Sequence, residues 1–369
     1  MAVRQSIVVA LMLFVASCYR TNVPNPVVPN SVFPKSGTPT STLPNPHANN
    51  AVAAARDADG VLSFYSFNGL TAGKTWNATS HNAFACKADE SGCREIVPVP
   101  VDDGRLASVA VTLRNKVFLF GGYTVAEDNS EISTPEVFAF DPVSENYTRV
   151  SDMPTPVDDM VAFSYLDRYI YLVSGWHNDG NVSLVQVYDV EEDAWFSATD
   201  YPGAPVFGHA GGAVGNKFLI ADGVAVIGVK EGRRQFGAVD EIWLGEIDPS
   251  NPAEISWQSL PAHPGVPLYR MAAGGDENAN RIVFVGGGDN PYNYTGIGYD
   301  GVPSKPSDKI FAFDLTAETW IDLGTHDRAT MDHRGLLFRD GAVCTLGGLD
   351  EALAVIGDLV CRDGMQIQN

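Results

Sequence analysis

A repeated pattern of paired glycines and late aromatic residues constrains the fold more than any other feature of this chain. In residues 117–150 the apolar run "VFLF" ends in Gly121 and Gly122, and a second apolar run, "VFAF", ends in Asp141. Tyr147 follows that aspartate after six positions. The same six-residue step returns at two further places, from Asp189 to Trp195 and from Asp314 to Trp320. Short apolar runs bounded by glycine or by a turn residue are typical of β-strands.

The pattern keeps its internal spacing while its period varies. The second glycine position of five copies falls at Gly122, Gly175, Gly223, Gly287 and Gly348, so the period runs from 48 to 64 residues. A weaker first copy begins at residue 61, and its segment "AFACKADESGCREI" aligns without a gap on "VFAFDPVSENYTRV". A constant pattern with a variable period indicates one structural unit whose loops differ in length. Six such units lie between about residue 49 and residue 363.

Each unit contains four short strands, because a small, apolar segment such as "LASVAVTL" (106–113) also precedes the glycine run. We name these strands a to d in chain order. Four-stranded units repeated at this period are the blades of a propeller. The sequence therefore predicts an all-β fold, a six-bladed β-propeller with four antiparallel strands per blade.

The glycine pairs, the aspartate turns and the late aromatic residues resemble the Kelch repeat of the galactose oxidase and Kelch superfamily. The resemblance implies a Kelch-type propeller over roughly the last five-sixths of the chain. In such a fold the glycines allow sharp turns, and the late aromatic side chain fills the gap between adjacent blades. The resemblance implies no particular function, because propellers host many.

The first 48 residues contain signals for export and attachment. Residues 1–18, "MAVRQSIVVALMLFVASC", combine one arginine, an apolar run and small residues before Cys18, as a signal peptide does. "VASC" resembles the bacterial lipobox, which implies that Cys18 is acylated; ordinary cleavage near Ala16 or Ser17 is the alternative. Residues 19–48 are rich in Pro, Asn, Ser and Thr and suit a flexible tether, with the propeller at 49–369. We therefore expect an exported lipoprotein of the bacterial cell envelope, in the periplasm or on the outer membrane, with free secretion as the alternative.

The four other cysteines fit two disulfides. In the repeat alignment Cys86 and Cys93 occupy the two sides of one c–d hairpin in the first unit. Cys344 and Cys361 fall on neighbouring strands b and c of the last unit. Disulfides persist in exported proteins. We therefore expect one bridge in each end blade, Cys86–Cys93 and Cys344–Cys361.

The charge of the chain limits its partners. The formal net charge is −21, and no basic patch is apparent, which argues against nucleic acid as a partner. The expected partners are a small polar ligand or an envelope or extracellular protein, with membrane contact only through the N-terminal lipid anchor. No set of His, Cys and Asp has the spacing of a metal site, so we expect no metal and no cofactor.

Polar residues on one face of the expected propeller mark the candidate site. In an up-and-down blade the d-to-a and b-to-c connections share a face, so their residues should meet around the mouth of the central channel. The residues just before strand a are Arg105, Asp159, His209, Arg270 and His333. The b-to-c connections add Trp176, His177, Tyr292, Asn293, Tyr294 and Tyr299. Such a mixture suits a polar small molecule, for example a sugar, and we expect Arg270→Ala and His209→Ala to weaken binding without disturbing the fold.

A second resemblance concerns carbohydrate chemistry. Residues 205–228 and the long aromatic b-to-c connection of blade five resemble the bacterial sialic acid mutarotases (N-acetylneuraminate epimerases). The catalytic glutamate proposed for that family follows an Asn-Gly pair, whereas this chain reads Asp222-Gly223-Val224. Asp222 and Glu231 remain as candidate catalytic carboxylates, with Arg233 or Arg234 as a candidate arginine. The copper chemistry of galactose oxidase is not expected, because its Cys–Tyr cross-link needs a cysteine and every cysteine is otherwise assigned.

Three functions from different classes follow from these observations. We favour a non-catalytic binding protein for a small polar ligand or a protein partner, because no catalytic constellation is visible. A mutarotase-like carbohydrate epimerase is the first alternative. A structural scaffold of the envelope that recruits other proteins is the second.

Overall fold

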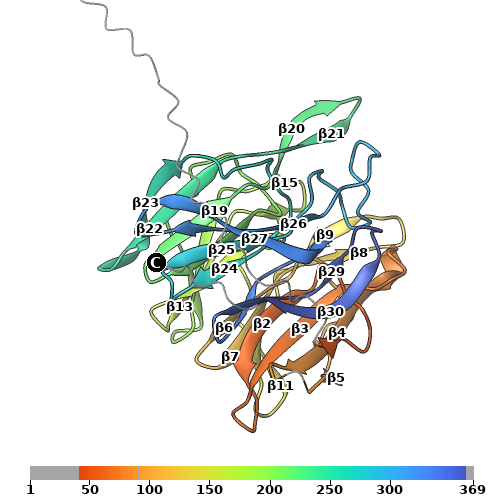
Figure 1. Cartoon of the computed structure of the whole chain (residues 1–369), viewed down its shortest axis with the longest axis vertical. Helices are drawn as coiled ribbons and strands as arrows, with labels where there is room; N and C mark the ends of the chain where they lie inside the picture. Colours follow the sequence, from red (N-terminus) through yellow and green to blue (C-terminus); the bar gives the residue numbers. More distant parts are fainter. Residues whose placement is uncertain (1–40, 90, 363–369) are drawn as a thin grey trace, which may run out of the picture.

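Six four-stranded antiparallel sheets form the part of the chain that the structure, a computed structural model, describes: residues 41–89 and 91–362. Figure 1 shows them arranged as blades around a common centre. The described part contains a single three-residue 3-10 turn, η1 (Trp76–Ala78), and otherwise only strands, turns and loops. The predicted six-bladed, all-β propeller is confirmed.

The strands follow the expected order a to d within each blade. Blade 1 consists of β2 (Ala51–Arg56), β3 (Leu62–Leu70), β4 (Thr79–Lys87) and β5 (Cys93–Ile96). Blade 2 consists of β6 (Val109–Leu113), β7 (Lys116–Phe120), β10 (Val137–Asp141) and β11 (Asn146–Val150). Blade 3 consists of β12 (Val161–Tyr165), β13 (Tyr169–Val173), β16 (Val185–Asp189) and β17 (Ala194–Ser197).

The second half of the ring repeats this order. Blade 4 consists of β18 (Ala210–Val214), β19 (Lys217–Ala221), β22 (Ile242–Asp248) and β23 (Asn251–Leu260). Blade 5 consists of β24 (Ala272–Asp276), β25 (Arg281–Val285), β26 (Ser307–Asp314) and β27 (Thr319–Thr330). Blade 6 consists of β28 (Leu337–Arg339), β29 (Ala342–Leu349), β30 (Val355–Arg362) and β1 (Ser41–Thr42).

Three b-to-c connections carry small hairpins of their own. These are β8 (Tyr123–Val125) with β9 (Glu131–Ser133), β14 (Trp176–His177) with β15 (Gly180–Asn181), and β20 (Val224–Lys230) with β21 (Arg233–Ala238). The hairpin β20–β21 extends beyond the body of the propeller (Figure 1).

The ring is closed by the start of the described chain, which the sequence analysis did not foresee. β1 pairs antiparallel with β30, so that Ser41 lies opposite Leu359 and Thr42 opposite Asp358. Residues 41–48, which were expected to belong to the tether at 19–48, therefore belong to the propeller. β1 is the outermost strand of blade 6, so the start and the end of the described chain share one sheet. Residues 1–40, with Cys18, lie outside the described residues.

The innermost strands lie side by side around a narrow channel, and glycine makes their approach possible. β18 contacts β12 on one side and β24 on the other. A Cβ atom on Gly275 of β24 would lie 1.9 Å from the carbonyl oxygen of Ala213 in β18. Any larger residue at position 275 would push the two blades apart, so close packing at the centre requires glycine here.

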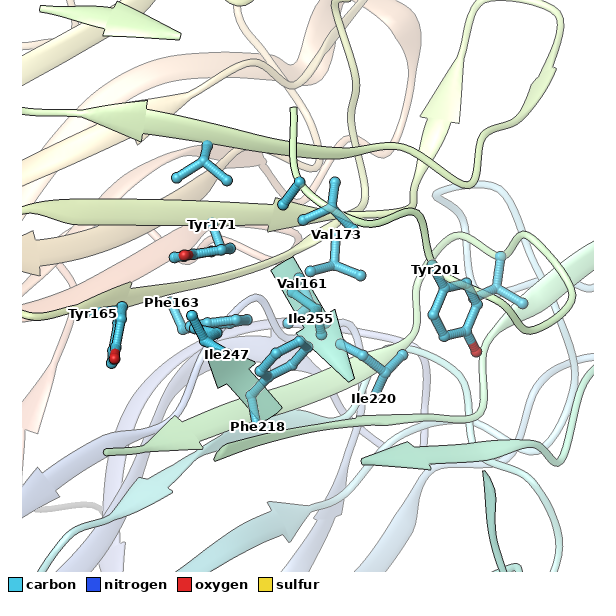
Figure 2. Close-up of a cluster of buried hydrophobic side chains, with 14 residues drawn as sticks. Val161, Phe163, Tyr165, Tyr171, Val173, Tyr201, Phe218, Ile220, Ile247 and Ile255 are labelled. Carbon is cyan, nitrogen blue, oxygen red and sulfur yellow. The ribbon is translucent and has the colours of Figure 1, made fainter. Parts of the chain in front are cut away.

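Aromatic side chains fill the space between blades, as expected for the late aromatic positions. Trp195 of blade 3 lies 6.0 Å from the ring of Phe120 in blade 2, and its Nε1 donates to the carbonyl oxygen of Ser151. Figure 2 shows the next interface, where Phe163 of blade 3 lies 4.5 Å from Phe218 of blade 4. Buried aromatic pairs of this kind contribute about 0.5–1.5 kcal/mol beyond their area.

The two expected cysteine pairs are brought together. Cys86 lies opposite Cys93 in the c–d hairpin of blade 1, and the two are bridged. Cys344 of β29 lies opposite Cys361 of β30 and is bridged to it. Each bridge joins directly paired strands, so the two blades on either side of the ring closure are the cross-linked ones.

Among the described residues, no helix is long and apolar enough to cross a membrane.

Candidate functional site

The d-to-a and b-to-c connections meet on one face of the propeller. Leu106, Asp158 and Phe207, which precede strand a in three consecutive blades, pair with residues just after strand b of the same blade. Their partners are Tyr123, Trp176 and Val224, respectively. Backbone pairing therefore fixes the two sets of loops to each other, and we call this side the loop face.

A ring of left-handed residues surrounds the channel at the loop face. In each blade, one residue shortly before strand a has φ between 54° and 70°: Asn49, Ala107, Asp159, Gly208, Arg270 and Asp332. Backbone hydrogen bonds run around part of this ring, since the amide of Gly208 donates to Asp159 and that of Arg270 donates to Gly208. Two of the five residues expected here, Asp159 and Arg270, are members of the ring. Arg105 precedes a ring position by two residues, and His209 and His333 follow one.

Buried charges close the channel at this ring. The guanidinium of Arg270 contacts Asp159 through Nη2 at 2.6 Å and Asp332 through Nη1 at 3.1 Å. Arg334 contacts the other carboxylate oxygen of Asp159 at 2.9 Å, and Nδ2 of Asn49 donates to Asp332. We call these residues the central plug. Its side chains are almost fully buried, so the mouth of the channel is filled rather than open.

The two carboxyl groups of the central plug have pKa values shifted in opposite directions. Burial alone would raise the pKa of Asp159, but Arg270 and Arg334 outweigh it and hold that pKa below its ordinary value. Burial raises the pKa of Asp332, although the same two arginines oppose the rise. Asp159 is therefore the principal counter-charge of both arginines.

A polar pocket lies beside the central plug on the loop face. It has a volume of about 410 Å³, and we call it the loop pocket. Its walls come from the hairpins of blades 2, 3 and 4, the long b-to-c connection of blade 5, and the residues before strand a. The residues that line it are Tyr123, Asn129, Glu131, Asp158, Asp159, Trp176, Asn178, Asp179, Phe207, Arg234, Phe236, Arg270, Asn293 and Tyr299.

Two carboxyl groups of the loop pocket have perturbed pKa values. Oδ2 of Asp158 accepts a hydrogen bond from the hydroxyl of Ser133 at 2.6 Å, and the residue is only 3% exposed. Oε1 of Glu131 accepts from the side-chain amide of Asn293 at 2.7 Å. Burial raises the pKa of Asp158 well above its ordinary value and also raises the pKa of Glu131. Carboxyl groups with perturbed pKa values in a concavity are candidates for a functional site.

An aromatic wall faces these carboxyl groups. The rings of Phe236 and Tyr299 stack with centroids 4.2 Å apart, and Trp176 lies 5.9 Å from Phe236. Arg234, on the same strand as Phe236, places its guanidinium carbon 5.3 Å from the centre of the Trp176 ring. It also pairs with Asp179 at 2.9 Å. The hairpin β20–β21 thus contributes one side of the pocket.

The structure gathers some of the predicted ligand-binding residues and separates the others. Asp159, Trp176 and Arg270 line the loop pocket, together with Asn293 and Tyr299 from the same loops. The others lie outside its lining. Arg105 pairs with Glu136, and His177 contacts the carbonyl oxygen of Pro156. Tyr292 is buried against Tyr269, and the hydroxyl of Tyr294 contacts Asn129.

Two of the three predicted histidines, His209 and His333, are buried beside the central channel. Nε2 of His209 lies 2.9 Å from the carbonyl oxygen of Val173, and Nε2 of His333 lies 3.0 Å from the hydroxyl of Thr330. Burial lowers the pKa of both rings, to about 4 and about 3. These neutral histidines serve packing and internal hydrogen bonding.

The candidate catalytic carboxylates lie away from the loop pocket. Asp222 is 1% exposed, and its Oδ2 accepts hydrogen bonds from His263 at 2.8 Å and from the amide of Leu268 at 2.7 Å. Glu231 sits in the exposed turn of the hairpin β20–β21. Four carboxyl groups line the pocket, those of Glu131, Asp158, Asp159 and Asp179, and sequence reasoning missed all of them except Asp159. The doublet Asp158-Asp159 before strand a was the available signal for Asp158.

Cavities elsewhere in the described residues differ from the loop pocket in their lining. The central channel encloses about 360 Å³ and is lined mainly by small side chains of the innermost strands. A groove of about 770 Å³ beside blade 5 is lined mostly by apolar residues, including Val266, Ile310 and Trp320. In residues 41–89 and 91–362, no group of three or more His, Cys, Asp or Glu side chains is placed to hold a metal ion.

Comparison with known proteins supports the repeat assignment. No family model matches the chain. It is 33% identical over 112 residues to chicken Kelch-like protein 15, a match that covers 30% of this chain and 22% of that protein. It is 28% identical over 189 residues to a putative F-box/kelch-repeat protein of Arabidopsis thaliana, covering 49% of each chain. The chain thus spans about a fifth of the length of the first relative and half of the second.

A solved structure extends the likeness to the whole ring. The structure of YjhT superposes with a TM-score of 0.67 over 87% of this chain and 95% of its own, at 14% sequence identity. At that identity the likeness concerns the fold alone. The chain is a six-bladed β-propeller whose repeats are similar to those of Kelch-repeat proteins.

Proposed function

We propose that this protein is an exported, lipid-anchored propeller that binds a small polar ligand in the loop pocket. The observation that carries this proposal is the convergence of Asp158, Glu131 and an aromatic wall in one concavity of about 410 Å³. That volume lies within the usual range for small-molecule sites, and a few placed polar groups against aromatic surface are the usual lining. A sugar fits this chemistry, since its hydroxyl groups bond carboxylates and amides while its apolar face stacks on rings.

Ligand binding is expected to depend on Trp176. Replacing it with alanine should weaken binding about tenfold, equal to about 1.4 kcal/mol, because one wall of the pocket is removed. The measurement is saturation-transfer NMR and calorimetry with D-glucose, D-glucosamine and D-glucuronate. Trp76→Ala is the matched control, because Trp76 is partly exposed on η1 in blade 1 and does not line the pocket. If none of the three compounds binds at millimolar concentration, or if both variants behave alike, the proposed site is rejected.

The path of β1 suits a lipid anchor. β30 runs from the loop face toward the opposite face, and β1 runs antiparallel to it. β1 therefore begins toward the side of blade 6 opposite to the loop face. We propose that a lipid at Cys18 leaves the loop pocket accessible to a ligand in the surrounding space.

The anchor makes a separate prediction. Cys18→Ser should release the protein from the membrane fraction into a soluble form, or leave its precursor uncleaved, because the acylated residue is lost. Detergent partitioning and mass spectrometry of the mature N-terminus measure this. Unchanged fractionation with a mature N-terminus at another residue would refute lipid attachment.

A mutarotase-like enzyme is the second candidate, and one observation favours it. Asp158 provides a buried carboxyl group with a raised pKa at the wall of the pocket, as a general acid requires. We nevertheless favour binding without catalysis, because the carboxylates suggested by the sequence resemblance, Asp222 and Glu231, lie elsewhere. Exchange NMR on the three sugars decides between the two: acceleration that Asp158→Asn lowers by about 10²–10⁴-fold would establish the enzyme. The last alternative is that the loop face binds an envelope or extracellular protein, with a purely structural role included.

A further inference from the structure

We infer that the ligand of the loop pocket is a small organic cation, a protonated amine carried on a hydroxylated body, because unpaired carboxyl groups face an aromatic wall there. The inference rests on the proposed ligand site and names the class of its ligand. It excludes an acidic sugar such as sialic acid as the preferred occupant.

Two of the four acidic residues that line the pocket, Asp158 and Glu131, lack cationic partners. Neither Asp158 nor Glu131 forms an ion pair with any of residues 41–89 or 91–362. Their hydrogen bonds come from neutral groups, the hydroxyl of Ser133 and the amide of Asn293. A positive charge entering the pocket would therefore meet negative or ionisable oxygen atoms that no side chain has neutralised.

The cations of the pocket are already occupied. Arg270 contacts Asp159, Asp332 and the carbonyl oxygen of Asn293. Arg234, the other arginine of the lining, pairs with Asp179. An incoming carboxylate would have to break one of these pairs, which makes an anionic ligand unfavourable.

The aromatic wall suits a positive charge. Cations are attracted to the faces of aromatic rings within about 6 Å of the centroid, most strongly for tryptophan. Arg234 demonstrates this on the protein's own wall, since its guanidinium lies over Trp176. A ligand amine would compete with Arg234 for that ring face and for Asp179, whose side chain is 96% exposed.

Proton linkage gives cation binding a measurable signature. Burial raises the pKa values of Asp158 and Glu131, and a bound cation would favour their charged forms. Binding of a cation should then release protons and tighten as pH rises, whereas binding of an anion should show the opposite trend. The other titratable or charged groups that face this cluster are Asp159, Asp179, Arg234, Arg270, Tyr123, Tyr269, Tyr299 and His177.

The decisive experiment uses Arg234→Met in the whole protein. The substitution removes the competing cation while keeping an apolar side chain on the hairpin. D-glucosamine should bind about tenfold tighter than D-glucose to the unaltered protein, and D-glucuronate should bind most weakly. Arg234→Met should tighten D-glucosamine binding about threefold, because Trp176 and Asp179 become free. Arg233→Met is the matched control, since it makes the same charge change on the same strand outside the pocket lining.

Each outcome decides one question. Tighter D-glucosamine binding in Arg234→Met, together with its loss in Glu131→Gln, supports the cation site. Preference for D-glucose or D-glucuronate, or weaker binding in Arg234→Met, overturns the inference and leaves the proposed binding function intact. Absence of binding by all three compounds overturns the proposed function itself.

Discussion

Replacing Arg270 with methionine is expected to lower the free energy of unfolding by about 3–5 kcal/mol, the usual cost of removing one partner from a buried ion pair. Arg270 is 2% exposed and contacts both Asp159 and Asp332. Its loss leaves two buried carboxyl groups with only Arg334 as a counter-charge. Denaturant unfolding at neutral pH, followed by circular dichroism, measures the change.

Two further variants make this result interpretable. Arg168→Met removes an arginine from an ion pair with Asp189, but the side chain is one-third exposed, so a loss of only about 0–1 kcal/mol is expected. Adding Asp159→Asn to Arg270→Met should recover about 1–2 kcal/mol, because an uncompensated charge disappears. If Arg270→Met costs no more than Arg168→Met, the central plug contributes little to stability.

This expectation replaces the one drawn from the sequence. We expected Arg270→Ala to weaken ligand binding without disturbing the fold, because residues before strand a were expected to surround the mouth of the central channel. The structure places Arg270 in a filled mouth, where its removal should alter stability first. Any loss of ligand binding in Arg270 variants must therefore be read against their stability.

The fold was predictable because packing between blades keeps the spacing of the repeated aspartate and aromatic residues constant. Trp195 must reach Phe120 in the next blade, so its distance from the turn at Asp189 cannot vary. The ring closure carried no such signal. β1 comprises two residues, Ser41 and Thr42, which is too short for alternation of apolar and polar residues to appear.

The site was harder to predict because the residues around the channel share a backbone conformation and not a residue type. The six left-handed positions around the channel hold Asn, Ala, Asp, Gly, Arg and Asp, which share no chemical property. Choosing polar residues near strand a therefore selected His209 and His333, one position beyond the ring. Glu131 was missed for a related reason: it lies on a hairpin inserted in one b-to-c connection, and no repeat alignment places such an insertion.

Below about pH 6 the propeller is expected to lose stability steeply, because several histidines are buried in the neutral form. Burial lowers the pKa of His209 and His326 to about 4 and that of His333 to about 3. Each histidine binds a proton more readily in the unfolded chain, so its contribution is fully present above about pH 6.5 and is lost as pH falls toward 4. Each shift of one pKa unit corresponds to about 1.4 kcal/mol, so the combined loss should reach several kcal/mol.

Other groups act in the opposite sense over part of this range. The raised pKa values of His263, Asp158 and Asp332 mean that these groups bind protons more readily in the folded chain. Their contributions are present below the unfolded pKa and are lost as pH rises through the folded pKa, so they make the acid decline shallower. Asp159, with its lowered pKa, steepens the decline once pH falls below about 4.

Replacing one buried histidine measures its contribution to the loss of stability at low pH. His209→Gln keeps a side-chain amide that can donate to the carbonyl oxygen of Val173, but it cannot titrate. The variant should be slightly less stable at pH 7.5, and its loss of stability between pH 7.5 and pH 4.5 should be smaller by about 2–3 kcal/mol. His81→Gln is the control for the substitution itself, since that ring is only partly buried and contacts the carbonyl oxygen of Val101. Parallel profiles for His209→Gln and the unaltered protein would mean that His209 is protonated equally in both states, and that its burial does not govern acid unfolding.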